Sequence, residues 1–305
     1  MVILMKKSQP DLFQPAIAAR REKVGHFIVS LAAMLIILLV IIVLGFTVFQ
    51  GTALFRKQQF SLTAFLTGVH WLPARGSFGA LPLIYGSLLV SAVSLLLAGP
   101  LALGTAIFIT ELSHKHWQQL FRSGLSILAG IPAVVYGLVG IVVVIPLLRE
   151  LLGGTGYGWL AAAIILAVMI LPVLITLTAD AFAAVPRKYQ VSATALGATK
   201  FQIWRTLIFP LATARLKTAL VFSFAQAFGE AVAVQMVVGN AALLPIKLNS
   251  PAATLTSVIT INLGDTSLNS SQNNALWSLA LVLLLMSLVF NLLTHYLIRG
   301  KKDFE

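Results

Sequence analysis

Glu230 is the residue best placed to do chemistry, because it is the one acidic side chain deep within a long apolar stretch. A charge at the centre of a bilayer costs about 2.5–3.5 kcal/mol, so its carboxylate must face protein or water. Gln226 precedes it by one helical turn, and Ala233 and Val237 continue the same predicted face. Two interpretations stay open. Glu230 pairs with a basic residue of a neighbouring helix and fixes packing, or it lines a path through the membrane, where it could form a gating ion pair.

A catalytic or metal-binding constellation is not recognisable in the sequence. The five histidines are scattered, and the pair His114 and His116 lacks the i, i+4 spacing of a helical metal site. The dipeptide at Gly300 and Lys301 lacks the glycine five residues earlier that a phosphate-binding loop needs. The absence of cysteine removes thiol nucleophiles and disulfides. We therefore expect no enzyme activity, no bound cofactor and no metal, so energy for any transport must come from elsewhere.

The composition is that of an all-α membrane protein, with 59% hydrophobic and 10% charged residues. Apolar runs of spanning length recur and predict six transmembrane helices. Prolines at 100, 132 and 172 are compatible with these helices, because packed neighbours can satisfy the freed carbonyls. Small residues along one face of the second span favour close packing. The six predicted spans are 27–49, 83–109, 125–148, 159–179, 218–239 and 276–298.

The net charge of +12 follows the membrane topology rather than indicating nucleic acid. With the N-terminus in the cytoplasm, 16 of the 21 Lys and Arg residues fall in inner segments and 5 in outer segments. This bias is the positive-inside rule, and it predicts cytoplasmic N- and C-termini. A nucleic-acid surface would instead gather its basic residues in one soluble domain.

The connecting segment 186–210 is polar and basic between apolar runs, and it reads as two short helices separated at Gly197. Pro186 suits the first turn, and Gly197 supplies a left-handed stop. Thr199 begins the second helix, with Gln202 completing a capping box. The small residues around the turn let another protein approach the backbone closely; they include Ser192, Ala193 and Ala198.

This segment resembles the cytoplasmic coupling loop of ABC importer permeases, in which an EAA motif, a glycine and a final proline recur at fixed spacing. Ala193, Gly197 and Pro210 fall in register, and Ala198 with Thr199 gives the common LGAT form. Val191 stands where the family prefers Glu, and Ser192 replaces an Ala. The resemblance implies that a partner ATPase docks on this loop. The implied docking residues are Ser192, Ala193, Gly197, Ala198, Thr199 and Pro210. An ordinary helical hairpin of another membrane protein is the alternative.

A second resemblance concerns the stretch GEAVAVQMVVGN, from Gly229 to Asn240, and the stretch 78–112. Both are similar to phosphate ABC transporter permeases of the PstC/PstA type, closer to PstC, and the likeness covers residues 78 to about 298. It implies a type I ABC importer (MetI-like) core of five helices preceded by an N-terminal anchor helix. It also implies a second permease, two ATPases that use ATP and Mg, and a periplasmic phosphate-binding protein. Glu230, Gln226 and Asn240 would then belong to the translocation path or gate.

One departure bears on the cargo, because Gln226 stands where these permeases commonly carry Arg. A neutral amide keeps hydrogen bonding but loses the Coulomb attraction for an oxyanion. Inorganic phosphate is the expected cargo, with sulfate, molybdate or a phosphonate as the alternative. A different class, an ion-coupled secondary carrier with Glu230 as its ion site, would show repeated halves or paired unwound helices, which the sequence does not display.

The expected organisation places the chain in a bacterial inner membrane. Residues 1–26 form a cytoplasmic tail, 27–49 the extra N-terminal helix, and 83–298 the permease core. The periplasmic segment 50–82 is rich in aromatic residues and packs on the bundle, meets an external partner, or anchors at the membrane interface. Segment 240–275 forms a second outer loop in which a short re-entrant helix is possible. Residues 299–305 form a cytoplasmic C-terminal tail.

Overall fold

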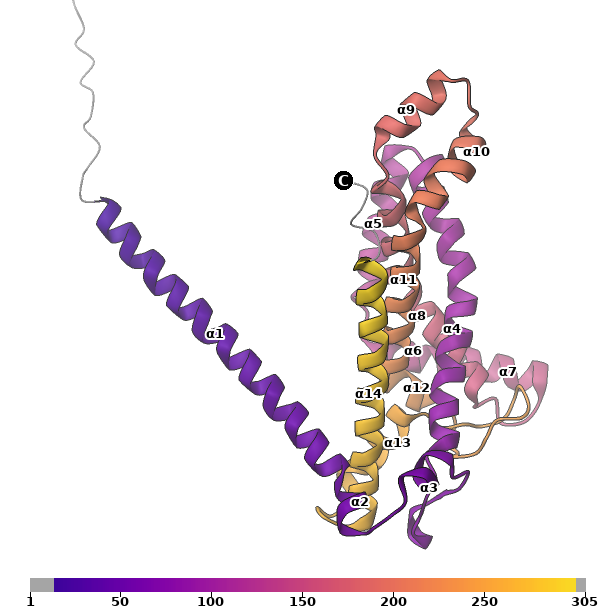
Figure 1. Cartoon of the computed structure of the whole chain (residues 1–305). Helices are drawn as coiled ribbons and strands as arrows, with labels where there is room; N and C mark the ends of the chain where they lie inside the picture. Colours follow the sequence, from indigo (N-terminus) through magenta and orange to yellow (C-terminus); the bar gives the residue numbers. More distant parts are fainter. Residues whose placement is uncertain (1–13, 300–305) are drawn as a thin grey trace, which may run out of the picture. The chain divides into compact units, whose positions relative to one another are not determined.

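A computed structural model describes residues 14–299 of the chain (Figure 1). The chain divides into two units, Met1–Phe49 and Gln50–Glu305. The described part of the first unit is helix α1, which begins at Gln14 and continues to Gly51. It contains the predicted anchor 27–49, and its side chains there are almost all apolar, as in a membrane span. Residues 14–26 of the predicted N-terminal tail are helical and belong to α1, whereas 1–13 and 300–305 lie outside the described residues.

The second unit is a helical bundle with one two-stranded antiparallel hairpin. Among residues 14–299, six helical stretches are long and apolar enough to cross a membrane, which agrees with the predicted number. The elements of the second unit are α2 (Ala53–Lys57), α3 (Leu62–Thr67), β1 (Trp71–Leu72), η1 (Pro73–Arg75), β2 (Ser77–Phe78), α4 (Leu81–Ile107), η2 (Phe108–Leu112), α5 (Lys115–Ala129), α6 (Ala133–Val139), η3 (Gly140–Val144), α7 (Ile145–Leu152), α8 (Trp159–Ala183), α9 (Arg187–Ala195), α10 (Lys200–Ile203), η4 (Trp204–Ile208), α11 (Phe209–Gly229), α12 (Val232–Val237), α13 (Leu255–Asn262), η5 (Leu263–Asp265) and α14 (Ser271–Arg299).

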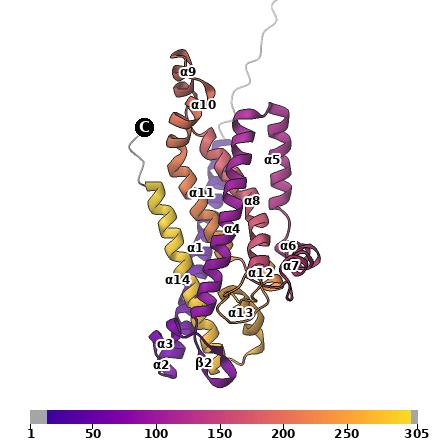
Figure 2. The same cartoon turned by 90° about the vertical axis from the view of Figure 1, so that its right-hand side faces the viewer.

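Helices α4 and α8 form the centre of the bundle, α11 packs against both, and α14 packs against α11 (Figure 2). The predicted small-residue face of the second span is buried in α4: Ser87, Ser91, Ser94 and Ala98 are each at most 3% exposed. Small side chains let two backbones approach closely, which is how membrane helices gain packing contacts. Prolines 100 and 172 lie inside α4 and α8, as expected.

The predicted third span, 125–148, is wrong as a single helix. The chain forms α5, breaks at 130–132, and continues as α6, η3 and α7; α5 stands upright in the bundle and α7 lies across it (Figures 1 and 2). Pro132 has extended backbone torsions and cannot donate an N–H, so α5 ends at Ala129. The apolar stretch of spanning length is accordingly Ala133–Leu152.

The predicted fifth span, 218–239, is also wrong as one helix. A continuous helical stretch runs from Lys200 to Gly229, and Glu230 lies directly after it in extended conformation. Ala233 and Val237 belong to the separate short helix α12, so they do not continue a face of α11. Glu230 therefore sits at a helix break rather than in the middle of a span.

The two long connecting segments pack against the bundle. In 50–82, Phe65 and Phe78 are buried in one cluster with Phe228 and Leu255, which supports the packing interpretation of the aromatic residues. Segment 240–275 contains the short helix α13, which contacts α4, α12 and α14. Its first turn is fixed by a Ser87 hydroxyl that accepts the Leu255 N–H at 2.8 Å.

Candidate functional site

The first candidate site is the α9–α10 hairpin, residues 186–210, which projects from the end of the bundle opposite α2 and α3 (Figure 1). Pro186 is the residue that precedes α9, one position earlier than a first-turn residue. Gly197 has φ +81°, and Ala198 N–H donates to the Ala193 carbonyl at 3.1 Å. The Gly197 N–H also donates to the Thr194 carbonyl at 3.0 Å, and the two bonds form the Schellman ending that glycine permits.

The second helix of the hairpin begins with the predicted capping box. The Thr199 hydroxyl accepts the Gln202 N–H at 3.3 Å, and the Gln202 side chain accepts the Thr199 N–H at 2.8 Å. Both ends of the turn are therefore fixed by local hydrogen bonds. The capped turn is an ordered protrusion, with Ser192 and Thr199 exposed and Ala193 and Ala198 half-buried.

Large apolar side chains cover the outside of this hairpin. Leu196, beside the turn, is 89% exposed, and Val191 and Phe201 are each 67% exposed. Three large apolar side chains exposed on one short hairpin favour a contact with another protein over exposure to water. The hairpin presents a preformed apolar surface next to a backbone that is open around Gly197, where an added Cβ would meet no atom within 4 Å.

The base of the hairpin is held by a buried cluster. Phe182 in the last turn of α8 and Val185 just after that helix pack with Ile203 and Ile208. The ring of Trp204 contacts Phe182 at a centroid distance of 6.0 Å. Pro210 lies in the first turn of α11, directly after the π-helical turn η4, where its missing N–H is tolerated. A force on the hairpin would therefore be passed to α8 and α11.

The second candidate site is Glu230. Its Oε1 accepts the N–H groups of Val232 at 3.1 Å and Ala233 at 3.3 Å, and so caps α12. Its carbonyl accepts the Thr256 hydroxyl at 2.8 Å. Among the residues whose side chains the structure describes, no Lys or Arg forms a salt bridge with this carboxylate. The predicted pairing with a basic residue of a neighbouring helix is thus not found in the described part of the chain.

Residues with hydroxyl groups line the same crevice as Glu230. Ser87 and Ser91 of α4, with Thr254 and Thr256 before and within α13, line a narrow crevice that Glu230 and Val234 also line. The crevice leaves no room for a water molecule in this conformation. It offers neutral donors and one carboxylate, and it contains no fixed positive charge among the described residues.

The structure does not bring the other two predicted path residues into the crevice. Gln226 lies on α11 with its Oε1 buried and without a hydrogen-bond partner among the described residues. Asn240 is exposed at φ +52° and donates its amide to the Gln235 carbonyl at 2.8 Å, closing the end of α12. Sequence reasoning missed Thr254 and Thr256. The Thr-x-x-Ser spacing from Thr254 to Ser257, which forms a capping box here, was the available signal.

A bundle of membrane-spanning helices with an ordered hairpin at one end defines the class of type I ABC importer permeases. The chain is similar in fold to a subunit of a bacterial ABC transporter for alginate, with a TM-score of 0.62, 17% identity, and coverage of 93% of this chain and 99% of that one. It is also similar to a subunit of the MetNI methionine ABC transporter, with a TM-score of 0.56, 19% identity, and coverage of 71% and 93%.

Residues 98–303 match the family described as binding-protein-dependent transport system inner membrane component, and the chain belongs to this family. A probable ABC transporter permease protein, YqgH of Bacillus subtilis, is 41% identical over 91% of each chain. Phosphate transport system permease protein PstC of Mesorhizobium japonicum is 31% identical over 77% of this chain and 78% of its own. A probable PstC of Methanocaldococcus jannaschii is 30% identical over 92% and 96%. The chain is therefore a multi-pass permease subunit of an ABC importer, and the ATPase is a separate partner.

Proposed function

We propose that this chain is a permease subunit of an inorganic phosphate importer in a bacterial inner membrane, with both termini in the cytoplasm. Its partners are a second permease, two cytoplasmic ATPases that use ATP and Mg, and a periplasmic phosphate-binding protein. Phosphate is proposed as the cargo because the chain is similar to PstC permeases, at 30–31% identity over most of its length. The chain itself needs no cofactor for this role.

The α9–α10 hairpin is the proposed dock for an ATPase. Its apolar tip at Leu196 and its capped ends fit a rigid contact with another protein. Helical structure continues from Lys200 to Gly229, about 45 Å at 1.5 Å per residue, and ends at Glu230. A movement of the hairpin would therefore be transmitted along this continuous helical stretch to the break at Glu230, beside the crevice. Opening and closing of the crevice in response to that movement would produce alternating access.

Glu230 is the proposed gate of the path, with Gln226 and Asn240 as accompanying polar residues. Its Oε1 is used by the α12 cap. Among the side chains that the structure describes, its charge has no cationic partner. A cation from the second permease would complete a gating ion pair across the two subunits. An ion pair that forms in one conformation and breaks in another would link opening of the crevice to the ATP hydrolysis cycle of the partner ATPases.

A different oxyanion is the second candidate cargo, because Gln226 stands where phosphate permeases commonly carry Arg. The test is uptake of labelled phosphate by the complete complex in proteoliposomes, with sulfate and molybdate as competitors. We expect only phosphate and its close analogue arsenate to compete. Strong competition by sulfate or molybdate, with weak competition by phosphate, would contradict the proposed cargo.

The docking role is tested with Gly197→Asp. The change adds a Cβ at a left-handed position and a charge at the proposed contact. Gly76 is the matched control, because it also has a positive φ, at +69°, and open space around an added Cβ. We expect Gly197→Asp to lose substrate-stimulated ATP hydrolysis in an assembled complex and Gly76→Asp to retain it. Equal coupling in the two variants would contradict the dock.

A further inference from the structure

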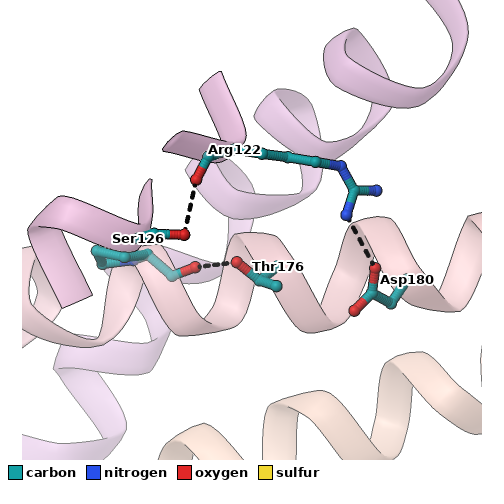
Figure 3. Close-up of polar contacts among 5 residues, drawn as sticks. Arg122, Ser126, Thr176 and Asp180 are labelled. Atoms are coloured by element: carbon teal, nitrogen blue, oxygen red, sulfur yellow. Dashed lines mark hydrogen bonds and ion pairs between the residues drawn. The ribbon is translucent and has the colours of Figure 1, made fainter. Parts of the chain in front are cut away.

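Arg122 of α5 and Asp180 of α8 form a salt bridge, with the Arg122 Nη1 3.6 Å from the Asp180 Oδ1 (Figure 3). Asp180 is the only charged residue in α8, so this is the one salt bridge that α8 can make. One turn along each helix, the Ser126 and Thr176 hydroxyls donate to carbonyls of their own helices at 2.9 Å. They add no link between α5 and α8. The charged link between the two helices therefore depends on Arg122 and Asp180.

On one side, this salt bridge adjoins the base of the α9–α10 hairpin. Asp180 lies between Ala179 and Phe182, which are both buried in the cluster that holds the hairpin. Phe182 also contacts the ring of Trp204. Since Asp180 occupies the same helical turn as these anchors, a displacement of the hairpin that moves the end of α8 also moves the carboxylate away from or toward Arg122.

On the other side, α5 leads to the Glu230 crevice. The Tyr136 hydroxyl of α6 donates to the Leu128 carbonyl of α5 at 2.8 Å, across the break at Pro132. That carbonyl is the one that an N–H at position 132 would reach in an unbroken helix. Helix α6 in turn packs directly on α12, because a Cβ added at Gly137 would lie 2.4 Å from the Met236 sulfur. Because Glu230 caps α12, a continuous series of contacts through α5, α6 and α12 connects Arg122 with Glu230.

The strength of the salt bridge suits a contact that opens. The two side chains are 53% and 57% exposed, and an exposed ion pair shifts an equilibrium by no more than about fivefold. A link of that size contributes little to permanent packing, yet it biases two conformations of similar free energy. The salt bridge therefore affects the balance between two conformations more than the stability of the fold.

We propose that Arg122 and Asp180 form a latch that holds α5 against α8 in this conformation and opens when the ATPases move the hairpin. Opening frees α5 and α6 to shift, which loosens α12 and the Glu230 crevice. This proposal rests on the docking role above. It adds a second route to the gate, through α8 and α5, beside the direct route through α11.

The latch is tested by the distance between α5 and α8 in the complete complex. The chain has no cysteine, so Gln119→Cys and Ala183→Cys introduce two exposed labelling positions, one on each helix, near the latch but outside it. Spin-label distances are measured without nucleotide and with ATP trapped by vanadate. We expect the distance to increase in the trapped state. An unchanged distance in a complex that imports phosphate would overturn the latch, whereas a changed distance in a complex that imports no phosphate would overturn only the cargo.

Charge variants test the function of the latch. Arg122→Gln and Asp180→Asn should each raise ATP hydrolysis without loaded binding protein, by up to about fivefold. The swapped double variant, Arg122→Asp with Asp180→Arg, should return hydrolysis toward the wild-type rate. Arg149→Gln is the control, because Arg149 of α7 donates to the Thr155 carbonyl in the loop before α8, at the opposite end of α8 from Asp180. Failure of the swap to restore coupling, with wild-type assembly, would overturn the latch.

Discussion

Replacing Glu230 by Gln separates the two roles of this residue, which are capping α12 and carrying a charge at the crevice. Gln has nearly the same shape and keeps an acceptor oxygen for the N–H groups of Val232 and Ala233. It removes the negative charge. We therefore expect an assembled complex whose uptake of phosphate falls by about tenfold, the factor that corresponds to ~1.4 kcal/mol of barrier.

The cost in stability follows from the two hydrogen bonds. A bond to a charged acceptor contributes about 1.5–3 kcal/mol and a neutral one about 0.5–1.5 kcal/mol, so each bond weakens by ~1 kcal/mol. Because Glu230 is only half-buried, we expect the total loss in unfolding free energy to stay below ~2 kcal/mol. Glu230→Ala leaves two N–H groups without an acceptor, so it should cost more stability than Glu230→Gln.

The assay is uptake divided by the amount of assembled complex, with thermal stability recorded on the same preparation. Ser278→Ala is the matched control, because it removes a buried 2.8 Å hydrogen bond from the Ser278 hydroxyl to the Gly51 carbonyl, outside the crevice, and leaves the Glu230 carboxylate in place. It should lower thermal stability and keep the uptake rate per complex. If Glu230→Gln shows a normal rate per assembled complex, Glu230 has only a packing role and the proposed gate is refuted.

Three further predictions concern other parts of the chain. Thr199→Ala should cost ~1 kcal/mol at the start of α10, seen as faster proteolysis of the hairpin in the intact complex. Gly140→Leu should prevent assembly, measured by purification of the complex, because even a Cβ there would lie 2.7 Å from Val237 Cγ1. Cysteines at Lys200 and Val69 should be labelled by an impermeant reagent from the cytoplasmic and periplasmic sides, respectively; the reverse pattern would contradict the topology.

The hairpin was predictable because neighbouring residues decide its structure. A glycine stop at Gly197 and a capping box from Thr199 to Gln202 need only a few residues of chain, so the sequence contains the whole signal. The six apolar stretches were predictable for a similar reason, because the bilayer sets their length and composition. The buried serine face of α4 followed from small-residue spacing alone.

The breaks within the predicted spans depend on residues far along the chain. Pro100 and Pro172 lie inside helices while Pro132 separates two, and the Tyr136 hydroxyl that bonds across this break is set by tertiary packing. The break at Glu230 is likewise completed by Thr256, which lies 26 residues later. A hydropathy pattern contains no information about such contacts. The predicted span 218–239 therefore combined parts of α11 and α12.

The central claim is that this permease receives force from an ATPase through the exposed tip of the α9–α10 hairpin. The most direct measurement is ATP hydrolysis stimulated by loaded binding protein in the reconstituted complex, for Leu196→Asp beside Leu268→Asp. The two leucines are 89% and 74% exposed, so neither change disturbs a buried core. The account predicts loss of stimulation for Leu196→Asp and wild-type stimulation for Leu268→Asp. Full stimulation in an assembled Leu196→Asp complex would contradict it.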